Sequence, residues 1–120
     1  MKLPDISIII TTKNEEKNIK NCLMSIEQNK NIQKEVIVVD NYSTDKTIEI
    51  AKQFDCKIYQ KGDERSKQRN FGIQQSNSNI ILFLDCDMII GPELLSKYAK
   101  FLNEKKKQNC IGLYIPEIIL

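Results

Sequence analysis

Histidine is absent from the 120 residues of this chain. Its absence excludes Ser–His and Cys–His nucleophilic pairs and every metal site that needs an imidazole ligand. Cysteine is present but scattered, without a C-x-x-C pair, at positions 22, 56, 86 and 110. That spacing fits neither a zinc site nor a thioredoxin-like motif. Three of the cysteines lie in apolar patterns, so we expect reduced core thiols in a cytosolic protein.

Targeting and membrane signals are also missing. The first residues, MKLPD, reach a proline and an acid before any apolar stretch, so we expect no signal peptide. No apolar run approaches the roughly 20 residues of a membrane span. The formal charge of +2, from 18 basic and 16 acidic residues, gives no basic field for nucleic acid or anionic lipid. We therefore expect a soluble cytoplasmic protein that binds no nucleic acid and is at most peripheral to the inner membrane face.

Short apolar runs rich in β-branched residues alternate with polar or amphipathic stretches. The runs predict strands at 6–10, 35–40, 56–59 and 79–85, and a further strand from 110 onward. Between them, the spacing of apolar residues predicts helices around 19–26, 43–54 and 64–76, and another beginning near Pro92. This alternation implies an α/β fold with a mostly parallel, Rossmann-like sheet and helices on both faces.

Polar residues at the predicted helix starts suggest where these helices begin. Thr12 and Glu15 fit a capping box, with Asn14 as a rival cap. Ser43 or Thr44 is expected to open the second helix. No repeat or linker divides residues 1–120, so we expect one domain. Its apolar ending, IPEIIL, suggests a domain that is incomplete at the C-terminus, the alternative being a terminal edge strand.

Polar side chains follow three of the predicted strands, at the edge where open α/β sheets bind ligands. They are Thr11, Thr12, Lys13 and Asn14 after the first strand, Asp40, Asn41 and Ser43 after the second, and Asp85 and Asp87 after the strand at 79–85. Asp40 could accept hydrogen bonds from a base or ribose, or it could simply cap the next helix.

The segment IILFLDCDMII carries two carboxylates on alternate positions. In extended chain, Asp85 and Asp87 would face one point while Cys86 turned toward the core. Two carboxylates so close repel each other unless a cation lies between them, and oxygen ligands with open positions suit Mg²⁺ or Mn²⁺ bridging to phosphate. The alternative is a strand that ends in a turn, with Asp87 capping something local. The pattern alone favours neither.

Both arginines of this lysine-rich chain, Arg65 and Arg69, lie one helical turn apart. On a helix they would share a face, and arginine is the better bidentate partner for phosphate. A solvated helix face is the competing interpretation.

Taken in order, four segments resemble the N-terminal half of a family 2 glycosyltransferase with the GT-A fold. They are SIIITTKNEEKNI, EVIVVDNYSTDKTIEIA, RSKQRNFGI and NIILFLDCDMII. The resemblance implies a nucleoside-diphosphate sugar donor, a UDP-sugar being the commonest in the family, a divalent Mg or Mn ion, and transfer to an acceptor with inversion.

The resemblance also implies roles for individual residues. Thr11, Thr12 and Asn14 would line the nucleotide pocket mainly through their backbone, with Ser43 beside them, and Asp40 would hydrogen-bond the base. Arg65 or Arg69, with Asn70, would lie near the diphosphate or ribose. Asp85 would face the ribose or sugar and share the metal with Asp87.

The chain departs from the family in two respects. The family usually shows DDGS where this chain has Asp40, Asn41, Tyr42 and Ser43. The general base is an acid in the family's second half, so we expect the catalytic residue beyond Leu120.

Three other functions compete with this one. A nucleotidyltransferase would need a glycine-rich, arginine-bearing loop after the first strand, and TTKNEE has no glycine. A phospho-acceptor receiver domain would need an acidic pair there. A truncated, non-catalytic nucleotide-binding or assembly module has no sequence feature against it.

Overall fold

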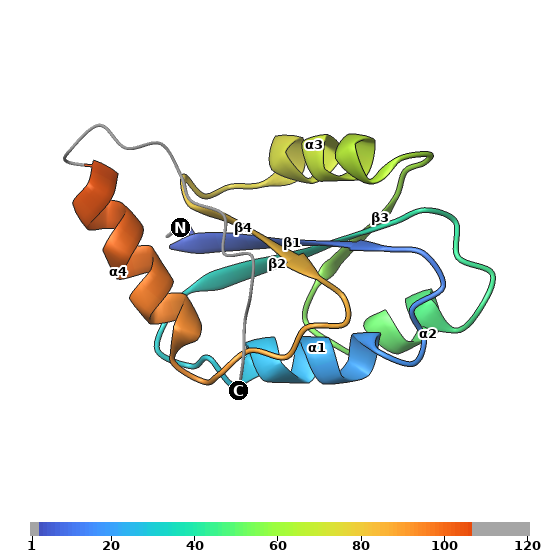
Figure 1. Cartoon of the computed structure of the whole chain (residues 1–120), viewed down its shortest axis with the longest axis horizontal. Helices are drawn as coiled ribbons and strands as arrows, with labels where there is room; N and C mark the ends of the chain where they lie inside the picture. The colour runs from blue at the N-terminus through green and yellow to red at the C-terminus, as the bar shows by residue number, and fades with distance from the viewer. Residues whose placement is uncertain (1–2, 107–120) are drawn as a thin grey trace.

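A computed structural model describes residues 3–106 of the chain. Its centre is a four-stranded sheet in the order β3-β2-β1-β4, in which all neighbouring strands are parallel (Figure 1). The strands are β1 (Ile6–Thr12), β2 (Lys34–Asp40), β3 (Lys57–Gln60) and β4 (Ile81–Asp85). The predicted strand from residue 110 onward lies outside the described residues.

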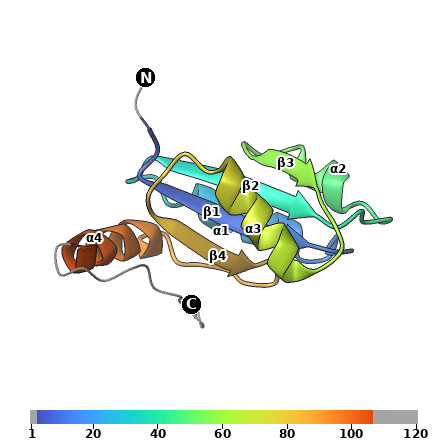
Figure 2. The same cartoon turned by 90° about the horizontal axis from the view of Figure 1, so that it is seen from above.

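Helices cover both faces of this sheet. They are α1 (Ile19–Glu27), α2 (Thr47–Ala51), α3 (Arg65–Gln75) and α4 (Leu94–Lys106). Helix α3 crosses one face, and α1 and α2 lie against the other (Figures 1 and 2). The predicted α/β class is therefore confirmed. Within residues 3–106, none of the helices combines the length and the apolarity that crossing a membrane requires.

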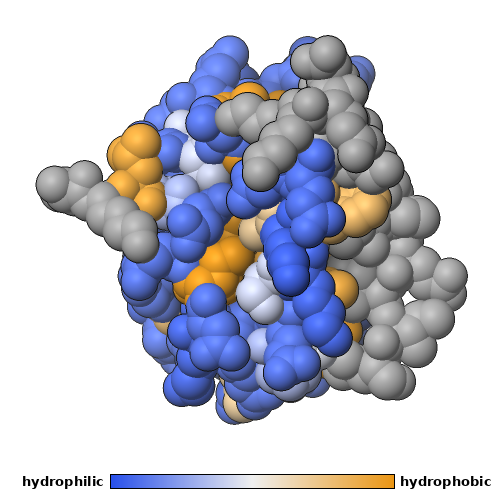
Figure 3. All heavy atoms as spheres, turned by 90° about the vertical axis from the view of Figure 1, so that its left-hand side faces the viewer, coloured by the Kyte–Doolittle hydropathy of each residue, from blue (hydrophilic) through white to orange (hydrophobic). Residues whose placement is uncertain are grey.

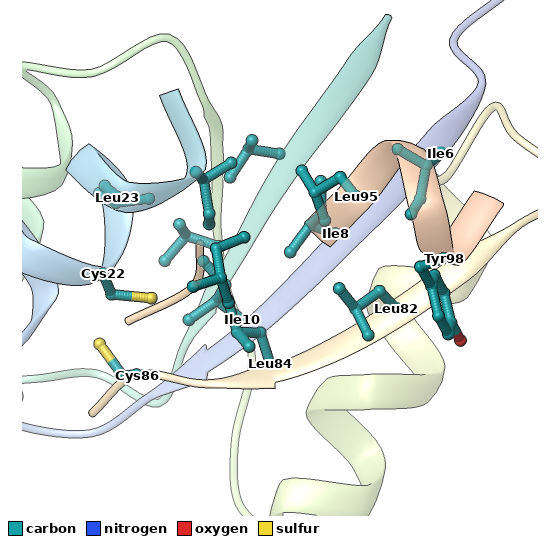
Figure 4. Close-up of a cluster of buried hydrophobic side chains, with 14 of the residues drawn as sticks. Ile6, Ile8, Ile10, Cys22, Leu23, Leu82, Leu84, Cys86, Leu95 and Tyr98 are labelled. Atoms are coloured by element: carbon teal, nitrogen blue, oxygen red, sulfur yellow. The ribbon is translucent and has the colours of Figure 1, made fainter. Parts of the chain in front are cut away.

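Successive residues of β1 point into two separate hydrophobic cores, a larger one and a smaller one. Every residue of β1 is buried, because β2 and β4 flank the strand and helices cover both of its faces. Ile6, Ile8 and Ile10 point into the larger core (Figure 4). The apolar residues of α1, Ile19, Cys22, Leu23 and Ile26, pack there too, together with residues of α4 such as Leu95. Burial of these branched side chains stabilises the fold by about 1.5–3 kcal/mol each.

The smaller core lies under α3. Ile9 of β1 and two residues of β2, Ile37 and Val39, form its buried centre. Gly72 lets α3 approach closely, since a Cβ atom at this position would lie 2.7 Å from Cγ2 of Ile9. The edge of Tyr59 packs against the ring of Phe71, with ring centroids 5.4 Å apart.

The predicted cap of the first helix and the predicted start of the second were wrong. Thr12 still belongs to β1 and its hydroxyl donates to Asp40, so it cannot cap a helix that begins at Ile19. Helix α2 covers only Thr47–Ala51 and not 43–54. The preceding residues are held in a loop, because Ser43 bonds to the side chain of Asp40. Side chains near the predicted starts therefore bond to the neighbouring loop and strand.

Glu35 of β2 ties three segments together near the amino ends of the strands. Its carboxylate accepts hydrogen bonds from Ser7 Oγ at 2.7 Å, from Lys57 Nζ at 2.7 Å, and from both the backbone N–H and the side chain of Asn77 at 2.8 Å. Burial alone would raise the pKa of Glu35, but the bonds from Lys57, Asn77 and Ser7 outweigh it and lower the pKa to about 2.

Glu35→Gln should lower the free energy of unfolding at pH 7 by about 1–3 kcal/mol, the range for hydrogen bonds to a charged group. Because the folded pKa is depressed, the carboxylate stabilises the fold above its ordinary pKa of 4.5, and this contribution is lost as the pH falls toward 2. Urea denaturation at several pH values should show a flatter acid decline in Glu35→Gln. Glu27→Gln, at an exposed position of α1, serves as control. Equal slopes in both variants would contradict the role of Glu35.

Candidate functional site

The carboxyl ends of β1, β2 and β4 bring the predicted polar residues to one edge of the sheet. In the parallel register, Thr12 lies beside Asp40 and Thr11 beside Asp85. Both threonines are buried. The carbonyl of Thr12 accepts hydrogen bonds from the Asn41 N–H at 2.9 Å and from the side chain of Gln68 at 3.2 Å. Thr12 therefore holds the edge together.

Asp40 is fully buried, with 0% of its surface exposed. Its oxygen Oδ1 accepts hydrogen bonds from Thr12 Oγ1 at 2.5 Å and Ser43 Oγ at 2.6 Å, and Oδ2 accepts one from the Ser43 N–H at 2.8 Å. Both oxygens are thus engaged within the protein. Asp40 does not cap the next helix, because α2 begins at Thr47 and has no side-chain cap. Its side chain instead holds the loop after β2 and has no exposed surface.

The loops after β1 and β2 are locked to each other. Asn14 adopts a positive φ of 53°, which asparagine tolerates better than most residues. Its N–H donates to Ser43 Oγ at 2.7 Å, and its Oδ1 accepts from the N–H of Thr44 at 2.8 Å. Lys13 adds a bond from Nζ to the carbonyl of Asn41 at 2.9 Å. These contacts give the edge a fixed shape around the ends of β1 and β2.

The two arginines of α3 point at the end of β4. Arg65 Nη1 lies 3.9 Å and Arg69 Nη2 3.6 Å from Oδ1 of Asp85. Arg69 also lies over the ring of Phe83, 5.3 Å from its centroid. The prediction that the arginines share a face is confirmed, and that face looks onto the sheet edge. Asn70 is exposed, and its side chain has no hydrogen-bond partner among residues 3–106.

Gln68 fixes α3 in this place, and the sequence analysis did not identify it. The residue is only 4% exposed. Its Nε2 donates to the carbonyls of Thr12 and Val39, at 3.2 and 2.8 Å, where β1 and β2 end. A glutamine in a polar stretch normally faces solvent. The available signal was Gly72 four residues on, since residues at i and i+4 share a helix face.

The chain turns directly after Asp85, the last residue of β4. The strand ends at Asp85, and a hydrogen bond from the Met88 N–H to the Asp85 carbonyl, 3.0 Å long, closes a turn. The extended geometry predicted for residues 85–87 is therefore wrong. Cys86 points into the core as predicted, toward Cys22 (Figure 4), and Asp87 is exposed.

Three carboxylates lie close enough to affect the thiol of Cys22. Burial, together with the negative charges of Asp87, Glu15 and Asp85, raises the pKa of Cys22 to about 12. The thiol therefore stays protonated at neutral pH. Within residues 3–106, however, no group of three or more acidic or cysteine side chains is placed to bind a metal ion. A cation here would need ligands from its substrate or from water.

Two buried polar residues, Ser25 of α1 and Asn29 just after this helix, hold the segment that follows the turn. Ser25 Oγ accepts from the Ile90 N–H at 3.1 Å. Asn29 donates to the carbonyl of Gly91 and accepts from the N–H of Leu95, both at 3.0 Å. Their spacing after Cys22, at i+3 and i+7, places them on the buried face of the helix. That periodicity was the signal for them in the sequence.

The opposite edge of the sheet looks different. A pocket of about 580 Å³ lies between α4 and the amino ends of the strands, and Asp5, Ile32, Ile80, Ala99 and Lys100 contribute to its lining. Figure 3 looks onto this side of the molecule, which is largely hydrophilic with a small apolar area. The lining of this pocket contains no arginine. The carboxyl edge, where two arginines meet a carboxylate, is therefore the candidate site.

Asp40→Ala should lower the free energy of unfolding by about 2–5 kcal/mol, because it leaves three buried or half-buried donors without their charged acceptor. Urea denaturation measures the change. Asp63→Ala, at an exposed carboxylate near the same edge, should change stability by less than about 0.5 kcal/mol. Similar small effects of both substitutions would show that Asp40 is not an anchor.

Comparison with known sequences places the chain in a family. The model of glycosyl transferase family 2 matches residues 7–117. The chain is 37% identical over 101 residues to the SPbeta prophage-derived glycosyltransferase SunS of Bacillus subtilis, covering 81% of this chain and 23% of SunS. It is 40% identical over 116 residues to an uncharacterized glycosyltransferase of Rickettsia typhi, covering 96% of this chain and 39% of that protein.

Comparison with solved structures agrees. The crystal structure of residues 1–349 of Staphylococcus aureus TarS, a poly(ribitol-phosphate) beta-N-acetylglucosaminyltransferase, matches with a TM-score of 0.75 and 32% identity, over 82% of this chain and 32% of TarS 1–349. The mannosyltransferase PcManGT of Pyrobaculum calidifontis matches in fold, with a TM-score of 0.75 and 23% identity, over 85% of this chain and 33% of PcManGT.

The chain therefore spans only part of each protein that it matches. The family match nevertheless covers residues 7–117, and the structural match to TarS covers 82% of this chain. The chain belongs to glycosyl transferase family 2.

Proposed function

We propose that this chain is the donor-binding part of a glycosyltransferase and binds a nucleoside-diphosphate sugar at the carboxyl edge of its sheet. The convergence of Arg65 and Arg69 on Asp85 carries this proposal. Their separations of 3.9 and 3.6 Å are longer than a hydrogen bond, so both guanidinium groups keep donors for phosphate. The side chains are 63% and 31% exposed, which lets a ligand reach them.

The metal assignment is part of the same proposal. Asp85 and Asp87 would hold Mg²⁺ or Mn²⁺, with water and phosphate oxygens as the other ligands, which is the usual arrangement for Mg²⁺. The residues fit this role because Asp87 is exposed and only Oδ1 of Asp85 faces the arginines. The bound cation would neutralise the departing nucleoside diphosphate.

The donor is proposed to be a UDP-sugar. TarS, 32% identical to this chain, has been crystallised with UDP-GlcNAc. In the present chain, Thr11 and Asn14 would line the nucleotide pocket. Asp40 and Ser43 would support its wall from inside, and half-buried Asn41 would face the base in place of Asp40.

The full reaction would be sugar transfer to an acceptor with inversion. It needs a general base, which we place in the part of the relatives that has no counterpart in these 120 residues. The acceptor site would lie there as well. A cytoplasmic location, peripheral to the inner membrane face, suits a donor made in the cytoplasm.

Calorimetric titration of the chain with UDP and with GDP, each with and without Mn²⁺, tests donor binding. We expect UDP to bind and Mn²⁺ to be required. Failure of both nucleotides to bind under either condition would contradict the proposal and favour a non-catalytic assembly module. Binding of GDP alone would keep the site and change the donor.

Asp87→Asn should abolish the Mn²⁺-dependent part of UDP binding, because the neutral amide is a poor ligand for a hard cation. The fold should be intact, since Asp87 is exposed. Calorimetry with and without Mn²⁺, beside a thermal melt, measures both. An unchanged Mn²⁺ dependence would remove Asp87 from the metal site.

Arg69→Ala should weaken UDP binding roughly 10- to 150-fold, the loss of one or two hydrogen bonds to a charged group. Lys67→Ala is the matched control on the same helix, because Lys67 pairs with Asp63, at 3.0 Å, and not with the cluster at Asp85. Equal losses in the two variants would indicate a general charge effect without a specific phosphate contact.

A further inference from the structure

Tyr42 combines two unusual features at the edge of the proposed site. Its backbone has a positive φ of 50°, a conformation that L-residues with bulky side chains rarely adopt. Its side chain is nevertheless 57% exposed, so burial in a core does not explain the tyrosine. Glycine, which the family usually has here, suits this backbone without strain. Strained positions of this kind concentrate at functional sites.

The ring of Tyr42 lies beside Gly62 in the loop before α3. A Cβ atom at Gly62 would be 3.6 Å from Cε2 of Tyr42 and 2.9 Å from Oδ1 of Asn41. The missing side chain at Gly62 therefore lets the loop approach both residues. The carbonyls of Asn41 and Tyr42 also lie 2.9 and 3.4 Å from Lys13 Nζ. These contacts fix the backbone at Tyr42, while much of the residue's surface is open to solvent.

The position of this ring matches the length of the proposed ligand. In the order β3-β2-β1-β4, Tyr42 follows β2, whereas Asp85 and its arginines lie at the end of β4. With neighbouring strands about 4.8 Å apart, two strand spacings separate these ends by about 10 Å. A nucleoside diphosphate with its phosphates at Arg65 and Arg69 can therefore extend its base along the edge toward Tyr42.

We infer that Tyr42 is the stacking platform for the nucleobase of the donor, an inference that rests on the proposed function. Aromatic rings bind bases through stacking, which tolerates any base because every base has a flat π-face. The ring would fix the plane of the base, and the amide of Asn41, with one donor and one acceptor function, would contact its edge. At a position where the family usually has glycine, Tyr42 would thus provide a ring that contacts the base.

The test compares a ligand that has the base with one that lacks it. UDP and ribose 5-diphosphate are titrated with Mn²⁺ into the wild-type chain, Tyr42→Gly, Tyr42→Phe and the control Phe101→Ala, an exposed aromatic residue on α4. Tyr42→Gly should weaken UDP binding by roughly 5- to 150-fold, the range for one stacked base, and leave ribose 5-diphosphate binding unchanged. Tyr42→Phe should recover the affinity for UDP, and Phe101→Ala should bind like wild type.

Three results would overturn this inference and leave the proposed function intact. They are unchanged UDP affinity in Tyr42→Gly, equal losses for both ligands, and a loss in Tyr42→Phe as large as in Tyr42→Gly. A thermal melt separates these from misfolding, because glycine suits the backbone at position 42 and Tyr42→Gly should melt no lower than wild type. A wild-type chain that binds neither ligand would instead overturn the proposed function, and this inference with it.

Discussion

The parallel pairing of β1 with β2 on one side and β4 on the other is the constraint on which the site depends. It sets Thr12 beside Asp40 and Thr11 beside Asp85, so residues far apart in the sequence end at one edge. A shift of one residue in either register would turn every side chain of a strand to the opposite face. The burial of β1 on both faces opposes such a shift. Ile8 and Ile10 pack in the larger core, whereas Ile9 between them packs in the smaller one.

Helix α3 connects the packing of the sheet to the chemistry of its edge. Gly72 allows the helix to lie close to Ile9, and Gln68 bonds to the last carbonyls of β1 and β2. With both anchors on one face of the helix, Arg65 and Arg69 are directed to the end of β4. Positioning by a rigid helix suits phosphate binding, because guanidinium groups bond in a fixed planar geometry.

The strands and their order of appearance were predictable, because runs of β-branched residues in a buried sheet have few alternatives. The cap of α1 and the start of α2 were not. Thr12 and Ser43 are typical capping residues, but both bond to Asp40, a contact across loops that local patterns do not contain. Gln68 was missed for the same reason, since its partners lie 29 and 56 residues away. The sequence therefore indicated which residues gather at the edge, and only the structure showed which of them are buried anchors and which are exposed.

Burial divides the acidic residues of this edge into separate roles. Asp40 has no exposed surface and serves the loop after β2. Asp85 is half-buried and faces two arginines, and Asp87 is exposed in the turn beyond. Because Asp40 has no exposed surface in this structure, we propose that neighbouring groups contact the base. This chain departs from the family pattern at the two positions that follow that buried anchor, half-buried Asn41 and exposed Tyr42. Asp40 thus holds the loop from inside, and we propose that the ligand is contacted by the residues that follow it, at positions 41 and 42.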